Sequence, residues 1–179
     1  SKDKVARISL SFHCTLPVQS PLLSLFGFFT SLLTGGITSF LYSVLRTRLK
    51  RVYKVSCFAE EVGNEVLVWI STSCTPKDAA VTLEALVAAL QIARDGGIAE
   101  PLIETAKQRA IFSIQSGCWT SPVHAAGFYA PQFLVSGRNL VTPAQLVKRI
   151  RRLTHKEVTH LLNEMMPVDR CSITYGAPT

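Results

Sequence analysis

The chain is poor in acidic residues and in charge generally. Asp and Glu number 12 of 179 residues against 19 Lys and Arg, which gives a formal net charge of +7 at pH 7. The few carboxylates fall mostly at turns and helix starts, where capping and the helix dipole account for them. A paired-carboxylate active site is therefore not expected. The basic excess is compatible with nucleic acid, an acidic partner or a mitochondrial address.

The sequence has no cysteine pair at the spacing of a metal site or a redox motif. Its five cysteines form an odd, scattered set without any C-x-x-C: Cys14, Cys57, Cys74, Cys118 and Cys171. This pattern predicts reduced, mostly buried thiols in a non-secreted protein rather than a disulfide framework. No signal peptide is visible, but the first residue, Ser1, suggests a processed or trimmed start, so a removed targeting segment stays an open alternative.

Charge is missing altogether from Ile8 to Leu45. A long uncharged run raises the question of a membrane span. The longest clean helical piece in it, Pro21 to Thr34, rises only about 21 Å, whereas a bilayer core needs about 30 Å. We therefore expect a buried core helix and no transmembrane span.

Motifs for nucleophilic or metal catalysis are also lacking. There is no G-x-S-x-G and no glycine loop that would cradle phosphate after a strand. The four histidines are His13, His124, His155 and His160. His155 and His160 are five residues apart, about 140° around a helix, and so cannot easily share one metal. No catalytic residue and no metal site are predicted in this chain.

The hydrophobic content of 47% is high, and the chain is long enough for one domain, residues 1–179, with a substantial core. So large an apolar fraction predicts that a partner covers part of the surface.

Period-2 patterns predict the strands. Apolar residues alternate with polar ones from Ala6 to His13, as in a half-buried strand. Val52–Ala59 and Val66–Ser73 flank a turn and should form a hairpin of central strands, because both are apolar on both faces. Alternation from Cys171 to Tyr175 predicts a terminal strand.

Helical patterns and caps predict the remaining elements. Leu22–Leu33 is apolar nearly all round and should be packed on several sides. The further helices are expected from Thr38 or Ser39 to about Leu49, from Thr75-Pro76 to about Arg94 with a largely buried interior, from Pro101 to about Gly117, from Ser121-Pro122 to about Val135, and after capping boxes at Thr142–Gln145 and Thr154–Glu157. The order predicts an α+β domain: an antiparallel or mixed sheet with its helices on one face.

A basic cluster, Lys148–Arg152, is the strongest indication of nucleic acid. Apolar residues interleave it at helical spacing, and no aromatic platform accompanies it. The solvated face of an amphipathic helix is the better interpretation, and nucleic-acid contact stays a weaker hypothesis.

The segment Gly35–Tyr53 changes from a helical to an extended pattern. The glycine pair Gly35-Gly36 ends one apolar helix and starts another, which delivers Arg46. The chain then turns into a strand near Tyr53. This corner should bring a cation and a phenol close together.

The same corner carries a resemblance to a known family. The run GGITSFL at Gly35–Leu41, then Leu45-Arg46, then YKVS at Tyr53–Ser56 resembles the C-terminal-type domain of the pitrilysin/insulinase zinc peptidases. That family includes the mitochondrial processing peptidases and the core proteins of respiratory complex III. The run Gly97–Lys107 also looks like a helix start of this family, and the likeness extends over nearly the whole chain.

The departures from the family define the functional hypotheses. The active half of the family carries H-x-x-E-H, which is absent here, so this chain cannot hold the family's zinc. The resemblance implies the partner half, in which Arg46 and Tyr53 would hold the substrate backbone or polarise its carbonyl. A glycine usually precedes that tyrosine by one to three residues in the family; here Leu49–Val52 occupies the segment.

Three hypotheses follow. The first is a catalytically inactive peptidase-like domain that serves as a structural or assembly subunit of a larger complex, in mitochondria at the matrix or the matrix face of the inner membrane. The second is the substrate-binding, non-zinc half of an active metallopeptidase, in which a second peptidase-like domain supplies the zinc and this chain holds no cofactor. The third is a nucleic-acid-associated subunit that uses Lys148–Arg152.

Overall fold

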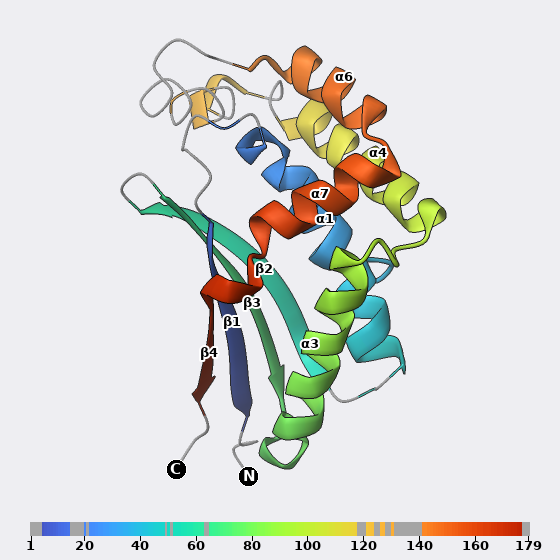
Figure 1. Ribbon diagram of the computed structural model, residues 1–179. Helices are drawn as coiled ribbons and strands as arrows, with labels where there is room; N and C mark the ends of the chain where they lie inside the picture. The colour runs from blue at the N-terminus through green and yellow to red at the C-terminus, as the bar shows by residue number, and fades with distance from the viewer. Residues whose placement is uncertain are drawn as a thin grey trace.

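The computed structural model describes residues 5–14, 20, 22–48, 50, 52–62, 65–117, 121–123, 126–127, 130 and 141–176. Four strands form one antiparallel sheet, and the helices lie on one side of it (Figure 1). This arrangement confirms the predicted α+β class with helices on one face of the sheet.

The sheet has the strand order β2-β3-β1-β4. Its members are β1 (Ala6–Cys14), β2 (Val52–Val62), β3 (Glu65–Cys74) and β4 (Cys171–Gly176). The first and last strands of the described chain lie side by side, because β1 pairs with β4 as well as with β3. The alternation predicted for β1 is confirmed, since every second residue from Ala6 to Cys14 is buried.

The hairpin of β2 and β3 is also confirmed, and β3 is a central strand as predicted, but the prediction that β2 is central too is wrong. β2 is an edge strand. In β3 buried residues alternate strictly with half-buried ones. Leu67 and Trp69 belong to the second face, which the described helices do not cover. Their apolar character made this face look like core in the sequence.

The described helices form the second layer. They are α1 (Phe26–Thr34), α2 (Phe40–Tyr42), a π-helical segment (Ser43–Arg48), α3 (Ala79–Arg94), α4 (Glu100–Gly117), α6 (Pro143–Arg152) and α7 (His155–Met165), with short 3-10 turns at Leu23–Leu25, Pro76–Asp78 and Val168–Arg170. The helix predicted from Ser121 to Val135 lies largely outside the described residues. Of the helices that the structure describes, none is both long and apolar enough to cross a membrane.

The core lies between the two layers. α1 contacts α4, α2 and β2, so its packing on several sides is confirmed. The largest fully buried side chains are Phe28, Phe29, Ile8, Leu32, Leu33, Leu41, Leu45, Ile70, Leu86, Ile103, Ile150 and Leu161.

α3 is less buried than its sequence suggested. Leu86, Leu90 and Ala93 are buried against the rest of the core. However, Val81, Val87 and Ile92 are 42, 45 and 49% exposed. The prediction of a largely buried helix is therefore wrong for these three residues of α3.

Both predicted capping boxes are present. The Thr142 hydroxyl accepts a hydrogen bond from the Gln145 backbone N–H at 3.2 Å, and the Gln145 side chain accepts one from the Thr142 N–H at 2.8 Å. Thr154 and Glu157 repeat the pattern at the start of α7. Each box satisfies two backbone donors that the first helical turn leaves without partners.

Candidate functional site

The corner between α1 and β2 begins with two glycines that the backbone requires. A Cβ atom on Gly35 would lie 2.6 Å from the backbone of Ser31, which is closer than atoms can pack. Gly36 adopts a φ of +104°, a conformation that other residues rarely take. Ser39 is the N-cap residue of α2, as predicted, but its hydroxyl donates to the Gly36 carbonyl at 2.7 Å and does not cap the helix.

A wide helical turn then presents Arg46. α2 continues into the π-helical segment Ser43–Arg48, and such segments are rare. The Arg46 guanidinium lies over the ring of Tyr42, 5.2 Å from the ring centroid, which is a cation–π contact. The spacing of four residues between Tyr42 and Arg46 was a signal for this contact that the sequence analysis missed.

A β-bulge at the start of β2 completes the corner. Val52 pairs with Cys74 and Lys54 with Ser73, so Tyr53 is the extra residue that has no partner in β3. Its carbonyl instead accepts a hydrogen bond from the Arg46 guanidinium at 2.9 Å. The structure thus brings Arg46 and Tyr53 together as the sequence predicted, although the contact is to the carbonyl and not to the phenol.

Donors remain available at this corner. Arg46 is exposed, and the side chain of Tyr53 is 53% exposed. Among the described residues, the Tyr53 hydroxyl has no hydrogen-bond partner, and Arg46 uses one of its five N–H groups. A guanidinium and a phenol can donate to peptide carbonyls and to a developing oxyanion.

The position of the missing glycine is taken by a strained lysine. Lys50 has a φ of +53°, the left-handed conformation that favours glycine. Its N–H donates to the Arg46 carbonyl at 3.1 Å, which closes the turn after the π-helical segment. The backbone of the corner therefore keeps a glycine-like shape three residues before Tyr53, even though the sequence has no glycine there.

The second run used for the resemblance, Gly97–Lys107, has a structural role. Lys107 is 6% exposed in α4, and its ammonium pairs with the Glu104 carboxylate at 2.5 Å. A buried cation is tolerated because this carboxylate compensates it. Lys107 therefore anchors α4 in the core.

The three histidines that the structure describes, His13, His155 and His160, lie apart from one another. His13 pairs with Glu65 at 3.1 Å in the sheet, whereas the His155 Nε2 atom lies 3.0 Å from the Ile98 carbonyl, in the helical layer. His160 is 3.9 Å from Glu164 on α7, and His124 lies outside the described residues. Over the part of the chain that the structure describes, no group of three His, Cys, Asp or Glu could hold a metal. The described residues therefore do not fit zinc.

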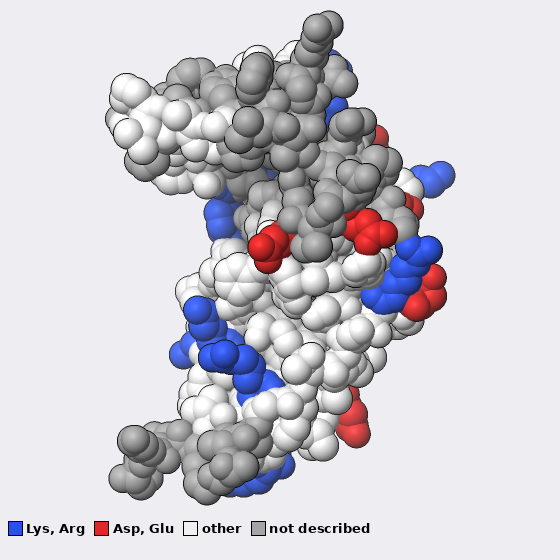
Figure 2. Space-filling model, turned by 90° about the vertical axis from the view of Figure 1, so that its left-hand side faces the viewer, with Lys and Arg blue, Asp and Glu red and all other residues white. Residues whose placement is uncertain are grey.

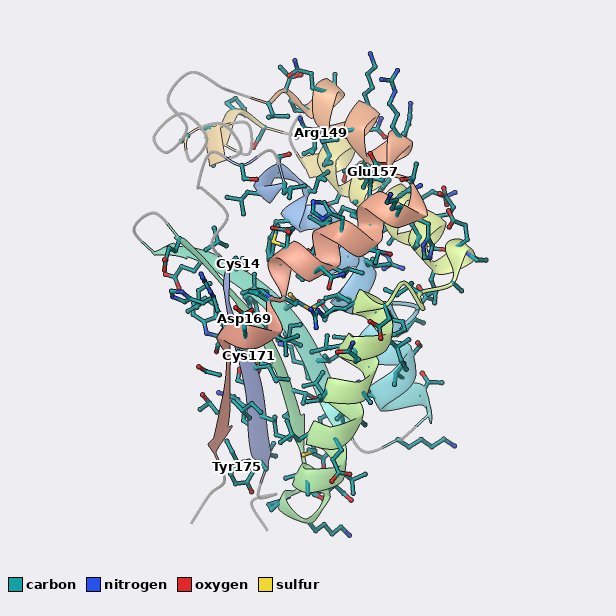
Figure 3. The ribbon with its side chains drawn as sticks, in the orientation of Figure 1. Cys14, Arg149, Glu157, Asp169, Cys171 and Tyr175 are labelled. Atoms are coloured by element: carbon teal, nitrogen blue, oxygen red, sulfur yellow. The ribbon has the colours of Figure 1, made fainter. Side chains whose placement is uncertain are left out.

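The basic cluster belongs to an amphipathic helix, as the sequence indicated. On α6, Leu146, Val147 and Ile150 are buried. Arg149 lies on the outer part of the helical layer, and its guanidinium donates to the Ser24 hydroxyl at 2.8 Å (Figure 3). The neighbouring basic residues form a solvated face. Arg149 of the basic cluster therefore links α6 to the 3-10 turn at Leu23–Leu25.

The described cysteines agree with the predicted reduced state. Cys14, Cys57 and Cys74 are buried and free, and Cys171 is half-buried and free. Cys14 lies at the end of β1 that faces α7 (Figure 3), and its thiol donates to the Met165 carbonyl at 3.1 Å. Burial, and then the nearby Glu164 carboxylate, raise its pKa to about 11.

Comparison with known protein families gives one match. The family described as "Peptidase M16 inactive domain" matches residues 1–110. No curated protein sequence matches the chain closely enough to identify a relative.

Three solved structures with the same fold come from bacteria. A protease from Helicobacter pylori superposes with a TM-score of 0.81 at 15% identity, over 96% of this chain and 41% of that one. A peptidase M16 inactive domain from Pseudomonas fluorescens gives 0.75 at 17% identity, over 98% and 42%. The inactive peptidase domain of a protein described as a zinc protease, from Bordetella parapertussis, gives 0.77 at 16% identity, over 100% and 96%. This chain therefore spans about two fifths of the length of the first two.

Proposed function

Because this chain belongs to the Peptidase M16 inactive domain family, we propose that it is the non-catalytic half of a two-part peptidase-like assembly, in which it holds polypeptide through Arg46 and Tyr53. The single observation that carries this proposal is the corner itself. A wide turn, a cation–π contact and a bulge together fix an exposed arginine beside an exposed tyrosine. The wide turn and the bulge interrupt regular backbone hydrogen bonding, and the corner buries little apolar surface. Stability alone therefore does not explain these features.

Hydrolysis would require a second domain. This chain has no H-x-x-E-H, and its described histidines are dispersed. Any zinc and the general base would therefore come from another peptidase-like domain. The donors of Arg46 and Tyr53 would orient the peptide and stabilise the negative charge that develops on its carbonyl.

A purely structural role in a larger complex is the second candidate. The apolar residues Val87 of α3 and Ile173 of the edge strand β4 favour it, because they line one hollow and are 45 and 55% exposed. Tyr175 lies at the free end of β4, where the sheet has an open edge (Figure 3). A partner domain could bury this surface. The basic charge and the reduced thiols support a mitochondrial setting for either role.

The test measures binding of an extended, uncharged peptide to the chain alone and then cleavage by the chain mixed with M16 domains that carry H-x-x-E-H. We expect Arg46→Ala to weaken binding about tenfold and Tyr53→Phe about threefold, as the loss of one charged and one neutral hydrogen bond. Arg151→Ala on α6 is the matched control, because it removes an exposed cation that lies away from the corner.

The outcomes separate the two roles. Loss of binding with Arg46→Ala and Tyr53→Phe, but not with Arg151→Ala, supports peptide holding. If both corner variants bind and support cleavage as the native chain does, peptide holding is wrong. The structural role would then stand if Val87→Lys and Ile173→Lys prevent assembly with the second domain.

A further inference from the structure

The face of the sheet opposite to the described helices carries three rows of side chains that cross β1, β3 and β2. The strand register defines them as Arg7–Ser73–Lys54, Ser9–Ser71–Ser56 and Ser11–Trp69–Phe58. We call this surface the open face. Its first row is cationic, its second consists of hydroxyls and its third contains two aromatic rings.

The cationic row borders a hollow of about 220 Å³. The lining residues are Arg7, Lys54, Ser56, Phe58, Ser71, Thr72 and Ser73. Arg7 and Lys54 both flank Ser73, so their backbones are about 10 Å apart and their long side chains can reach one small group. Among the described residues, no carboxylate lines this hollow.

Of the polar side chains around the hollow, the Thr72 hydroxyl donates to the Lys54 carbonyl at 2.9 Å, whereas the others have no partner within the described part of the chain. Neither Arg7 nor Lys54 takes part in an ion pair there, and the hydroxyls of Ser56, Ser71 and Ser73 make no hydrogen bond to another described residue. Two cations and three hydroxyl donors around one hollow form a recognition site for a carboxylate.

The aromatic row lies farther along the same face, and the side of Phe58 nearest to Ser56 also borders the hollow. Phe58 is 56% exposed, although it is directly opposite Trp69 in the register. Arg7 and Ser11 are four residues apart in β1, so the cationic and aromatic rows are separated by about 13 Å. An extended ligand that lies along the strands covers the same distance in four residues.

The opposite end of the open face is acidic. Glu60 lies opposite Leu67 in the next row, and Glu65 pairs with His13. Figure 2, which views the molecule from the side where the sheet lies, shows a group of basic side chains within a largely uncharged surface. A face with a cationic end and an acidic end suits a polypeptide of mixed character and repels a continuous polyanion such as nucleic acid.

We propose that the open face binds an extended polypeptide segment, with an Asp or Glu side chain in the hollow between Arg7 and Lys54 and an apolar side chain four residues away on Phe58 and Trp69. This inference rests on the proposed peptide-holding function and adds the class of sequence that is held. The corner supplies donors for any peptide backbone, whereas the open face selects side chains.

The experiment measures the affinity of the full chain for a short peptide with a blocked N-terminus and an amidated C-terminus. The peptide carries one glutamate, with a leucine four residues away on each side and serine or threonine between them. Exchange of the glutamate for glutamine should weaken binding about fivefold to tenfold. Moving both leucines by one residue should also weaken it, because they would then point away from the face.

Variants of the chain assign the effect to the hollow. Arg7→Ser with Lys54→Ser should remove the preference for glutamate over glutamine. Arg151→Ser with Arg152→Ser on α6 lowers the net charge equally and should leave the preference intact. A matched oligonucleotide should bind weakly and without dependence on Arg7 or Lys54. A thermal unfolding curve confirms that each variant folds.

Several results would overturn the inference. The first is equal affinity for the glutamate and glutamine peptides. The second is a preference for glutamate that persists in the Arg7 and Lys54 variant or disappears in the α6 control. The third is tighter binding of the oligonucleotide at Arg7 and Lys54. A glutamate peptide with a free C-terminus that binds only through that terminus would also overturn it. Arg46→Ala with Tyr53→Phe tests the proposed function in the same assay: if these variants abolish binding while no preference for glutamate exists, the proposed function stands and the open-face inference fails.

Discussion

The two faces of the sheet consist of alternate residues of the same strands, but they differ in burial and in the share of polar side chains. On β1 the helix-covered face carries Ile8, Leu10 and Phe12, none of them more than 4% exposed. The open face carries Ser9, Ser11 and other polar residues of the same strand. The covered face is built for burial, and its composition needs no further explanation.

The open face has a composition that stability does not require. Small hydroxyl residues contribute little to a β-sheet, and an exposed Phe58 beside a half-buried Trp69 adds apolar surface in water. The comparison teaches that residues of the covered face are constrained by packing, whereas those of the open face are free to be selected for a ligand.

The largest expected effect comes from a matched pair of phenylalanines on the two faces. Phe12 is 4% exposed on the covered face, and Phe58 is 56% exposed on the open face. Phe12→Ala should lower the free energy of unfolding by about 3–5 kcal/mol, because it leaves a cavity in the core. Phe58→Ala should lower it by about 1 kcal/mol or less. Urea unfolding measures the free energy of unfolding of both variants. If Phe12→Ala and Phe58→Ala lower it equally, the open face is buried in solution.

A second effect concerns alkaline stability. Because the pKa of Cys14 is raised from an ordinary 9.0 to about 11, the unfolded chain gives up this proton first as the pH rises. The contribution of the protonated thiol to the free energy of unfolding is fully present below about pH 9 and is lost between about pH 9 and 11. Burial also raises the pKa of Cys57, so both thiols of the covered face act in the same direction.

The measurement is the free energy of unfolding as a function of pH. Cys14→Ala should make the alkaline decline shallower than in the native chain. Ser11→Ala on the open face of the same strand should leave the slope unchanged. A native chain whose stability is flat from about pH 9 to 11 would show that Cys14 is accessible to water.

The smallest of the three effects comes from the helix that covers β1. α7 buries Val158, Leu161 and Met165, and its first turn is closed by Thr154. Thr154→Ala should cost about 1 kcal/mol of stability through loss of the cap. Thr174→Ala, at an exposed position of β4, is the control and should cost less than about 0.5 kcal/mol.

The same variant should change the response to acid. The Thr154 backbone N–H, and then its hydroxyl, lower the pKa of Glu157. The hydrogen-bonded carboxylate of Glu157 therefore adds to the free energy of unfolding above the pKa that this group has in the unfolded chain, and the addition is lost as the pH falls. Thr154→Ala removes the hydroxyl, so its stability should fall less steeply toward low pH than that of the native chain. An identical slope in both proteins would contradict the assignment.

Much of the fold could be predicted from local sequence, because its signals are local. The alternation in β1, the capping boxes at Thr142 and Thr154, and the glycine pair at Gly35 each depend on backbone geometry within a few residues. The corner could also be located, since the residues that end a helix and start a strand are near one another in the chain. Its bonding could not, because the Tyr53 carbonyl becomes available to Arg46 only through a bulge in the pairing with β3.

By itself, the sequence determined the two-layer class, the helix ends and the pairing of a cation with a tyrosine at one corner. Only the tertiary structure decided that β2 is an edge strand, that apolar residues of α3 such as Val87 are exposed and that Arg7 and Lys54 border one hollow. The physical reason is that hydrophobic periodicity reports which side of a strand is buried, whereas strand order and register depend on contacts between residues far apart in the chain. β1, β3 and β2 come together from three separate segments, and no local pattern states which of their side chains will share a row.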